Sequence, residues 1–331
     1  MDERIIECVP NFSEGRNKNT IEAIAEAIRS VDGVRLLDVD AGYTANRTVY
    51  TFVGDPESVG DAAFLAIQKA VELIDMRNQK GEHPRIGAAD VCPFVPVRNV
   101  TLQDCMRVAR IVAQRVGLEL GVPVYCYGDA AFASNRADLA ACRKGQYEGL
   151  RQKMEDPDWR PDFGPFEYDQ AVERSGAAVI GARPYLIAVN FNLDTRSVKI
   201  ANEIARTLRE SGSKGQPGRL KCCKAIGWYI EEYGIAQVSM NLTNMDVTPL
   251  HVAYEAVCEE ARRHSQFVTG TEIIGLVPKQ ALVDAGHYFM SKRGWDVGDS
   301  DDMVMYSAIR QLGLDNLKPF KPSKKVIECM I

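Results

Sequence analysis

The sequence predicts an α+β fold made of two ferredoxin-like subdomains with mixed or antiparallel sheets. The chain has 331 residues, enough for roughly two domains at about 150 residues per domain. The order strand, helix, strand, strand, helix, strand occurs in the first half and again after Arg183. That order is a split βαβ unit, and finding it twice indicates a duplication. The expected subdomains are residues 1–181 and 182–331.

The first repeat begins with a strand over residues 4–9 and a helix with one apolar face. Strands over residues 34–40 and 47–53 then follow each other directly, which predicts an antiparallel hairpin. Asp55 and Pro56 are typical of a helix start, and a strand over residues 87–95 closes the unit. The helical positions are apolar at a spacing of three or four: Ile21, Ile24, Ala25 and Ile28, then Val59, Ala63, Ala66, Ala70 and Ile74.

The second repeat has the same order. Residues 185–191 read as a strand, and Ala201, Ile204, Ala205 and Leu208 mark a helix. The runs KAIGWYI and IAQVSMNL form the expected strand pair. Thr248 and Pro249 are expected to cap the next helix, which precedes a final strand, TEIIGLV.

An extension follows the first repeat. Thr101 and Asp104 have the spacing of a capping box before a long amphipathic helix, and residues 122–127 read as a further strand. Residues 153–168 are rich in Pro, Asp and aromatic residues, so we expect an irregular segment between the subdomains. We expect the boundary between the two subdomains near Gly181.

Composition excludes several classes of protein. Forty basic and 45 acidic residues give a formal net charge of -5, which does not favour nucleic acid as a partner. Nine scattered cysteines in apolar runs predict reduced thiols and a cytoplasmic protein. The first ten residues lack a signal-peptide pattern, and no run approaches the ~18 apolar residues of a membrane helix, so no membrane association is expected.

Among the four histidines, His83 stands apart. It lies in the loop QKGEHPRIG, between a predicted helix and a predicted strand, where reactive groups are found disproportionately often. An ordinary exposed loop histidine is the alternative interpretation. The other three lie on predicted helices without acidic or cysteine partners at ligand spacing. The sequence contains no zinc-binding motif, so we predict no metal. It also lacks the glycine motifs that are typical of nucleotide-binding folds.

Specific strings resemble the formiminotransferase domain of the glutamate formimidoyltransferases. In the first half these are ECVPNFSEG, LLDVDAG, NRTVYTFVG, KGEHPRIGAADVCPF and PDFGP. In the second half QPGRLKCCKAIGWYI, TNMDVTPLH and IIGLVPKQAL continue the resemblance over essentially the whole chain. Mammalian relatives carry a second, cyclodeaminase domain; because this chain ends at Ile331, we expect that activity to be absent.

The resemblance implies a reaction and its substrates. Members of this family transfer the formimidoyl group of N-formimidoyl-L-glutamate to N5 of tetrahydrofolate, giving 5-formimidoyltetrahydrofolate and glutamate in histidine degradation. It also implies two ferredoxin-like subdomains, with folate in a groove between them, and a homodimer. Because an amide anion is a poor leaving group, the chemistry needs a proton donor, for which histidine is the usual choice.

The resemblance also assigns residues. His83 occupies the position of the family's catalytic histidine. Asp40 matches an acidic position in LLDVDAG and could orient the imidazole, although an ordinary hairpin aspartate is the alternative and Asp38 is a rival for the role. Arg47 and Arg85 are our choices for binding the donor carboxylates.

The folate segment of the family maps onto the run GPFEYDQAVE, with five candidate residues: Gly164, Pro165, Phe166, Glu167 and Tyr168. The match weakens after Pro165, and the two aromatic rings could either stack on a pterin or pack on their own domain.

The sequence is also compatible with two other functions. One is formyl transfer between 5-formyltetrahydrofolate and glutamate, since one pocket residue could distinguish a carbonyl oxygen from an imino nitrogen. The other is a non-catalytic folate-binding protein, because a ferredoxin-like fold does not by itself specify an enzyme.

Overall fold

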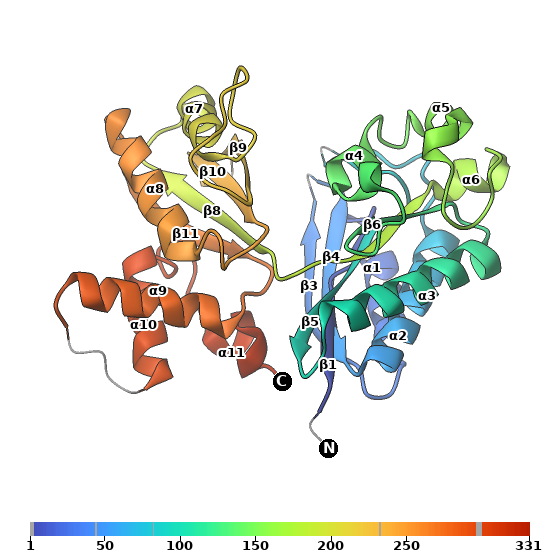
Figure 1. The fold of residues 1–331 in the computed structure, drawn as a ribbon, viewed down its shortest axis with the longest axis horizontal. Helices are drawn as coiled ribbons and strands as arrows, with labels where there is room; N and C mark the ends of the chain where they lie inside the picture. The colour runs from blue at the N-terminus through green and yellow to red at the C-terminus, as the bar shows by residue number, and fades with distance from the viewer. Residues whose placement is uncertain (1–2, 44, 82, 232, 296–299) are drawn as a thin grey trace. The chain divides into compact units, whose positions relative to one another are not determined.

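The computed structural model describes residues 3–43, 45–81, 83–231, 233–295 and 300–331. The chain divides into two compact units, Met1–Pro184 and Tyr185–Ile331. Gly181, near which the sequence suggested a boundary, lies inside a strand of the first unit. Figure 1 shows both units as ribbons, and each has its own sheet and helices.

The sheet of the first unit has the ferredoxin-like order, extended on one side (Figure 1). Its strands run β3, β4, then β1 and β2 in line, then β5, β7 and β6. All pairings are antiparallel except β5–β7 and β6–β7, which are parallel. The bounds are β1 (Ile5–Cys8), β2 (Asn11–Phe12), β3 (Arg35–Gly42), β4 (Arg47–Gly54), β5 (Ala89–Arg98), β6 (Val124–Gly128) and β7 (Ala178–Ala182). The mixed sheet confirms the predicted fold class.

Three long helices form the main core of this unit with the sheet. They are α1 (Lys18–Arg29), α2 (Pro56–Leu73) and α3 (Leu102–Leu120). The expected caps are confirmed: Asp55 accepts from the backbone N–H groups of Glu57 and Ser58, and Thr101 and Asp104 form a reciprocal capping box. Each cap satisfies N–H groups that the first helical turn leaves unpaired.

A smaller core lies between the sheet and the segment from residue 134 to 175. That segment holds η1 (Ser134–Arg136), α4 (Leu139–Arg143), α5 (Leu150–Glu155), η2 (Pro157–Trp159) and α6 (Gln170–Ser175). Residues 153–168 therefore belong to the first unit, where Phe163 pairs with Val124 of β6. As expected, this segment is largely irregular, with no helix or strand over residues 160–168. Its expected location between the subdomains was wrong, because Met154 and Trp159 pack in this core.

The second unit repeats the ferredoxin-like order in an antiparallel sheet, β11, β8, β10, β9. Its repeat consists of β8 (Ile187–Leu193), α7 (Val198–Leu208), β9 (Cys223–Ile230), β10 (Ile235–Leu242), α8 (Leu250–Arg263) and β11 (Val268–Ile274). Four further elements follow: α9 (Lys279–Lys292), α10 (Asp301–Leu312), α11 (Pro322–Lys325) and η3 (Ile327–Cys329). The repeated order is confirmed.

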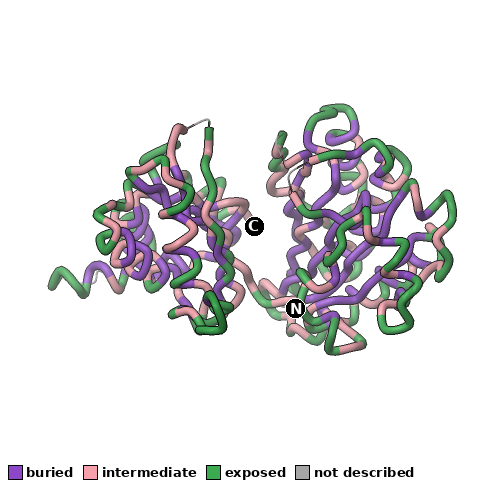
Figure 2. The backbone as a smooth tube through the Cα atoms, turned by 90° about the horizontal axis from the view of Figure 1, so that it is seen from above, coloured by how far each residue is buried: buried purple, intermediate pink, exposed green. Residues whose placement is uncertain are grey.

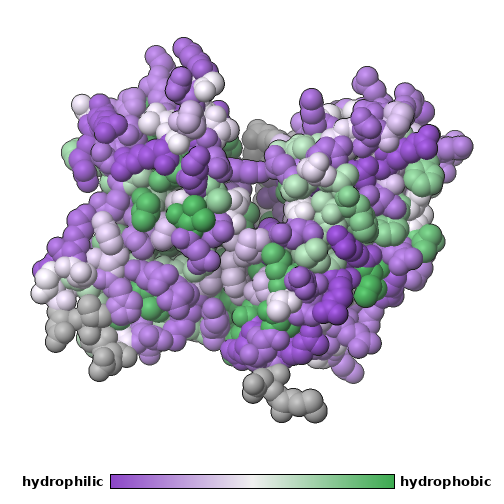
Figure 3. All heavy atoms as spheres, viewed as in Figure 1, coloured by the Kyte–Doolittle hydropathy of each residue, from purple (hydrophilic) through white to green (hydrophobic). Residues whose placement is uncertain are grey.

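The expected side-chain cap of α8 is wrong. Pro249 occupies the N-cap position without a side-chain hydrogen bond, and the Thr248 hydroxyl donates instead to the Lys221 carbonyl at 2.7 Å. In Figure 2 the buried backbone segments lie inside each unit, beneath exposed loops. The surface that Figure 3 shows is mostly hydrophilic, with hydrophobic side chains scattered over it. No helix in the described part of the chain is both long and apolar enough to cross a membrane.

Candidate active site

His83 lies in the loop between α2 and β5, beside Arg47, the first residue of β4. Its Nδ1 is 2.7 Å from the Pro84 carbonyl oxygen. Nη1 of Arg47 is 2.7 Å from Nε2 and 3.1 Å from Nδ1. Because a carbonyl oxygen only accepts, Nδ1 carries the proton of the neutral ring, and Nε2 presents its lone pair to the guanidinium. The structure thus selects one tautomer of His83.

Burial and two arginines keep the His83 ring neutral. Burial lowers the pKa of His83 to about 3, assisted by the charges of Arg47 and then Arg143, while the Pro84 carbonyl acts in the opposite direction. Burial also lowers the pKa of Arg47 to about 10, partly opposed by the charge of Asp90. Arg47 therefore remains charged at neutral pH and His83 does not. A neutral imidazole can accept a proton at Nε2 once Arg47 no longer occupies that lone pair.

The low pKa of His83 predicts a loss of stability in acid. Between pH 6.5 and about 3 the unfolded chain binds a proton at this residue and the folded chain does not, so stability falls as the pH falls. From pH 6.5 to 5 the loss should reach about 2 kcal/mol, at 1.36 kcal/mol per pH unit. Urea unfolding of the wild type and of His83→Asn across this range measures it. Parallel pH profiles for the two proteins would contradict the prediction.

The hairpin between β3 and β4 holds the His83 loop through Asn46. The Asn46 backbone has a positive φ of 48°, and its Oδ1 accepts from the backbone N–H of Gly15 at 3.0 Å. Its Nδ2 donates to the Lys80 carbonyl at 2.9 Å, and its own carbonyl accepts from Nε2 of Gln79 at 2.9 Å. Three chain segments are thereby joined at one buried amide. Arg47, the next residue, is placed beside His83 by this arrangement.

Gly81 provides a direct test of that packing. A Cβ at this position would lie 2.1 Å from the Ala45 carbonyl oxygen and 2.9 Å from the Asn46 Cβ. Gly81→Ala should therefore displace the loop and lower kcat/KM at least about tenfold, because small misplacements of catalytic groups are costly. Gly60→Ala in α2 is the matched control, since its Cβ would meet Val108 Cγ1 at 3.4 Å. Equal activity in both variants would show that loop placement does not matter.

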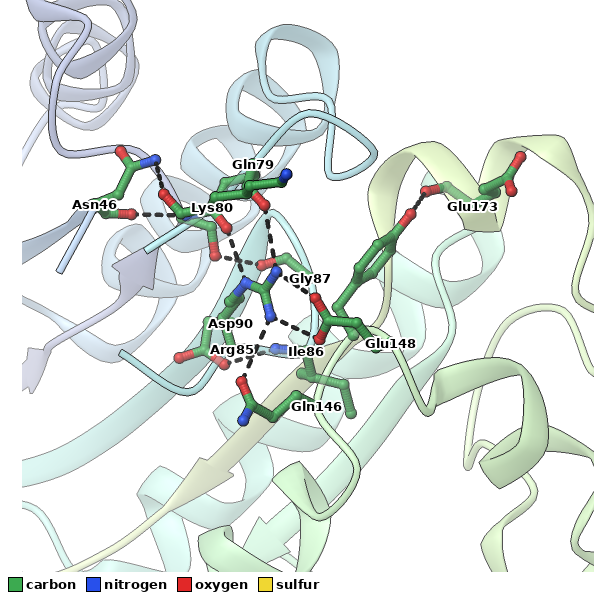
Figure 4. Close-up of polar contacts among 12 residues, drawn as sticks. Asn46, Gln79, Lys80, Arg85, Ile86, Gly87, Asp90, Gln146, Glu148 and Glu173 are labelled. Carbon is green, nitrogen blue, oxygen red and sulfur yellow. Dashed lines mark hydrogen bonds and ion pairs between the residues drawn. The ribbon is translucent and has the colours of Figure 1, made fainter. Parts of the chain in front are cut away.

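Arg85, expected to bind a substrate carboxylate, uses all five of its N–H groups in contacts within the protein (Figure 4). Its Nε and Nη2 donate to the side chain and carbonyl of Gln79 at 2.8 and 3.2 Å. Nη1 and Nη2 form a fork with the carboxylate of Glu148 at 2.8 and 2.7 Å, and Nη1 also reaches Gln146 at 3.4 Å. The side chain could bind a substrate only if Glu148 moved away. In this structure Arg85 positions the His83 loop.

A third arginine, Arg143 at the end of α4, was missed by the sequence interpretation. It forms an ion pair with the fully buried Asp90, its Nε lying 3.0 Å from Oδ1 and its Nη2 contacting Oδ2. Oδ1 of Asp90 also accepts from the backbone N–H of Ile86 at 3.2 Å. The pair therefore holds the His83 loop at the start of β5. No motif surrounds Arg143, so only the tertiary structure identifies it.

Asp40 lies on the edge strand β3 and is exposed. Asp40 pairs with Val49 and Gly42 pairs with Arg47, so Asp40 and Arg47 are diagonal neighbours across the β3–β4 pair. The charge of Asp40 raises the pKa of Arg47. No hydrogen bond between Asp40 and His83 is present among the residues that the structure describes. Asp38, the rival, is half-buried and has partners of its own.

The predicted folate segment lies against the end of α3 and the start of β6. Gly164 has a φ of +87°, and a Cβ there would lie 2.3 Å from the Val122 carbonyl oxygen, so only glycine fits. The Tyr168 ring packs beneath the guanidinium of Arg151, with 4.3 Å from Cζ to the ring centroid. Phe166 is 61% exposed. Pro165 is half-buried and Glu167 exposed, and this segment forms no hydrogen bond with His83 among the described residues.

Comparisons with known proteins identify the family of this chain. The family model described as the formiminotransferase domain, N-terminal subdomain, matches residues 5–183, and the formiminotransferase domain model matches residues 188–331. The chain is 49% identical to the formimidoyltransferase-cyclodeaminase of Gallus gallus over 99% of its own length, but spans only 60% of that relative. It is 45% identical to the glutamate formimidoyltransferase of Thermoplasma acidophilum, covering 92% of this chain and 98% of the relative. The Streptococcus pyogenes glutamate formimidoyltransferase is 44% identical, with 88% and 95% covered. The chain therefore belongs to the formiminotransferase family, as its sequence motifs predicted.

Proposed function

We propose that this chain transfers the formimidoyl group of N-formimidoyl-L-glutamate to N5 of tetrahydrofolate, releasing L-glutamate, as a step of histidine degradation. The observation that carries the proposal is similarity over nearly the full length of two relatives named glutamate formimidoyltransferase. The bifunctional relatives extend well beyond the matched region, so their second activity is not part of this proposal.

His83 would first act as a base. N5 of tetrahydrofolate attacks the amidine carbon, forming a tetrahedral intermediate in which N5 must lose a proton. Nε2 of His83 is the unprotonated nitrogen, because Nδ1 is engaged with the Pro84 carbonyl, and its lone pair becomes available when Nη1 of Arg47, 2.7 Å away, turns to a donor carboxylate. The imidazolium formed next to Arg47 is a strong acid, since burial and the neighbouring cations favour its deprotonation. It then protonates the glutamate nitrogen as the carbon–nitrogen bond breaks, and the neutral ring is restored.

Arg47 would bind a donor carboxylate. In the structure its Nη1 faces the imidazole, and its Nε and Nη2 form no hydrogen bond with another described residue. A carboxylate placed there would gain charge-assisted hydrogen bonds and bring the scissile nitrogen beside His83. It would also offset the positive charge that disfavours imidazolium. The same contact would therefore bind the donor and help the proton transfer.

For tetrahydrofolate we propose the segment from Gly164 to Tyr168 as part of the binding surface. Phe166 is the exposed ring in that segment and is available to stack on a flat heterocycle, whereas the Tyr168 ring is already covered by Arg151. Phe166→Ala should weaken tetrahydrofolate binding about 5- to 10-fold, and Phe267→Ala, an equally exposed phenylalanine of the second unit, is the control. Equal affinities would remove Phe166 from the binding surface.

A spectroscopic assay tests the proposed reaction. Purified protein and tetrahydrofolate are supplied with N-formimidoyl-L-glutamate, and a separate reaction contains 5-formyltetrahydrofolate with glutamate. Turnover with the first donor is expected. Turnover with the second pair alone would instead indicate formyl transfer, and tetrahydrofolate binding without turnover in either reaction would indicate a binding protein.

Three further expectations accompany the proposed function. The protein should form a homodimer and act in the cytoplasm. Activity should not depend on a metal ion; in the described part of the chain, no three His, Cys, Asp or Glu residues gather as metal ligands would. Treatment with EDTA should leave turnover unchanged, and a loss of activity that zinc restores would contradict this expectation.

A further inference from the structure

The proposed donor has two carboxylates. Arg85, which the sequence suggested as a binding group for one of them, is already engaged by other residues of the protein. Arg47 has N–H groups available beside His83, whereas the five N–H groups of Arg85 are all used within the protein. If Arg47 binds one carboxylate of the donor, another cationic side chain must bind the second.

Arg143 has the geometry that such a group needs. Its Nε and Nη2 are fixed on the buried carboxylate of Asp90, while its Nη1 makes no hydrogen bond with another residue that the structure describes. The side chain is 14% exposed, so that open edge remains accessible from solvent. One half of the planar guanidinium is thus immobilised and the other half is available. An arginine held in this way loses little further freedom on binding a carboxylate.

The sheet register brings this pair close to Arg47. Phe12 of β2 pairs on one side with Thr48 of β4 and on the other with Ala89 of β5. β4 and β5 both run antiparallel to β2, so they start at the same end of the sheet, where Arg47 is the first residue of β4 and Asp90 the second of β5. The charge of Arg143 lowers the pKa of both His83 and Arg47, and the charge of Asp90 raises that of Arg47. These four side chains therefore share one electrostatic environment.

We propose that Arg143, held by Asp90, binds the side-chain carboxylate of the formimidoyl donor, while Arg47 binds its α-carboxylate. The inference rests on the proposed function. The assignment of the two ends follows from the chemistry, because the α-carboxylate is next to the nitrogen that His83 must protonate, and Arg47 contacts His83 directly. Arg143 then determines that the donor is an acidic amino acid.

A purely structural role, in which Arg143 only compensates the charge of Asp90, makes a different prediction. It would affect all donors equally, whereas a binding role affects only donors with the side-chain carboxylate. Two donor analogues separate these cases. N-formimidoyl-L-glutamine has a neutral amide in place of the side-chain carboxylate, and N-formimidoyl-4-aminobutyrate lacks the α-carboxylate.

The test measures kcat/KM of wild type, Arg143→Lys and the double variant Asp90→Asn/Arg143→Gln with all three donors. The double variant removes both charges together, so that no buried charge is left unpaired. Loss of Arg143 should lower kcat/KM for the glutamate and aminobutyrate donors about 10- to 100-fold more than for the glutamine donor, whose own loss reports any displacement of the His83 loop. Arg143→Lys should show the same pattern more weakly.

Two outcomes would overturn the inference. One is full activity of the variants with the glutamate donor. The other is an equal loss of activity with all donors. If the double variant failed to fold, Arg143→Lys would decide by the same ratio. Absence of wild-type turnover with N-formimidoyl-L-glutamate would instead reject the proposed function itself.

Discussion

Replacing His83 by alanine should lower kcat by about 10² to 10⁴. The reason is that one imidazole both removes the N5 proton and protonates the leaving nitrogen. Among the described residues, the only titratable side chain in hydrogen-bond contact with Nε2 is that of Arg47, which keeps its proton at neutral pH. Steady-state kinetics with N-formimidoyl-L-glutamate measures the effect. Tetrahydrofolate affinity, measured by calorimetry, should change little, so the loss is one of transition-state stabilisation.

His264→Ala is the control for the His83 variant. His264 ends α8 in the second unit, where its Nδ1 lies 3.8 Å from a carboxylate oxygen of Glu203. This variant should retain full turnover. Partial recovery of His83→Ala by added imidazole would support a proton-transfer role. A His83→Ala protein with wild-type kcat would remove histidine from the mechanism, even if the chain proved to be a formimidoyltransferase.

Replacing Asp90 by alanine should destabilise the protein by about 3–5 kcal/mol. The carboxylate is fully buried and accepts from Arg143 and from the Ile86 backbone, so its removal leaves a largely buried guanidinium without its counter-ion. Urea unfolding at pH 7.5 measures the free energy of unfolding.

Asp61→Ala provides the matched control for the Asp90 variant. Asp61 pairs with Arg115 at 2.6 Å, but the two side chains are 51% and 35% exposed, so the expected cost is below about 1 kcal/mol. Equal losses in the two variants would show that the Asp90–Arg143 pair is not specially important. A stable Asp90→Ala protein would indicate that Arg143 finds another partner.

Local patterns identified most of the fold. Helix caps such as Asp55 and the Thr101–Asp104 box, and the alternation in the strands, act over a few residues, so they can be read directly from the sequence. Two of the features that the sequence interpretation missed depend on distant contacts. β7 was not expected, because it is stabilised by pairing in parallel with β5 and β6, which lie far away in the chain. Residues 153–168 were interpreted as a connection between the subdomains, because their contacts with the first unit are also made to residues distant in the chain.

For the candidate site too, local sequence identified some features and distant contacts decided the others. The sequence by itself determined the family, the repeated ferredoxin-like order and the singular position of His83, because these depend on residue identity and local periodicity. Only the tertiary structure decided what the charged groups do. It placed Arg47 at the imidazole, engaged Arg85 with Glu148 and brought Arg143 to Asp90 across 53 residues of chain. Ion pairing depends on distance and burial in space, and neither can be read from spacing along the sequence.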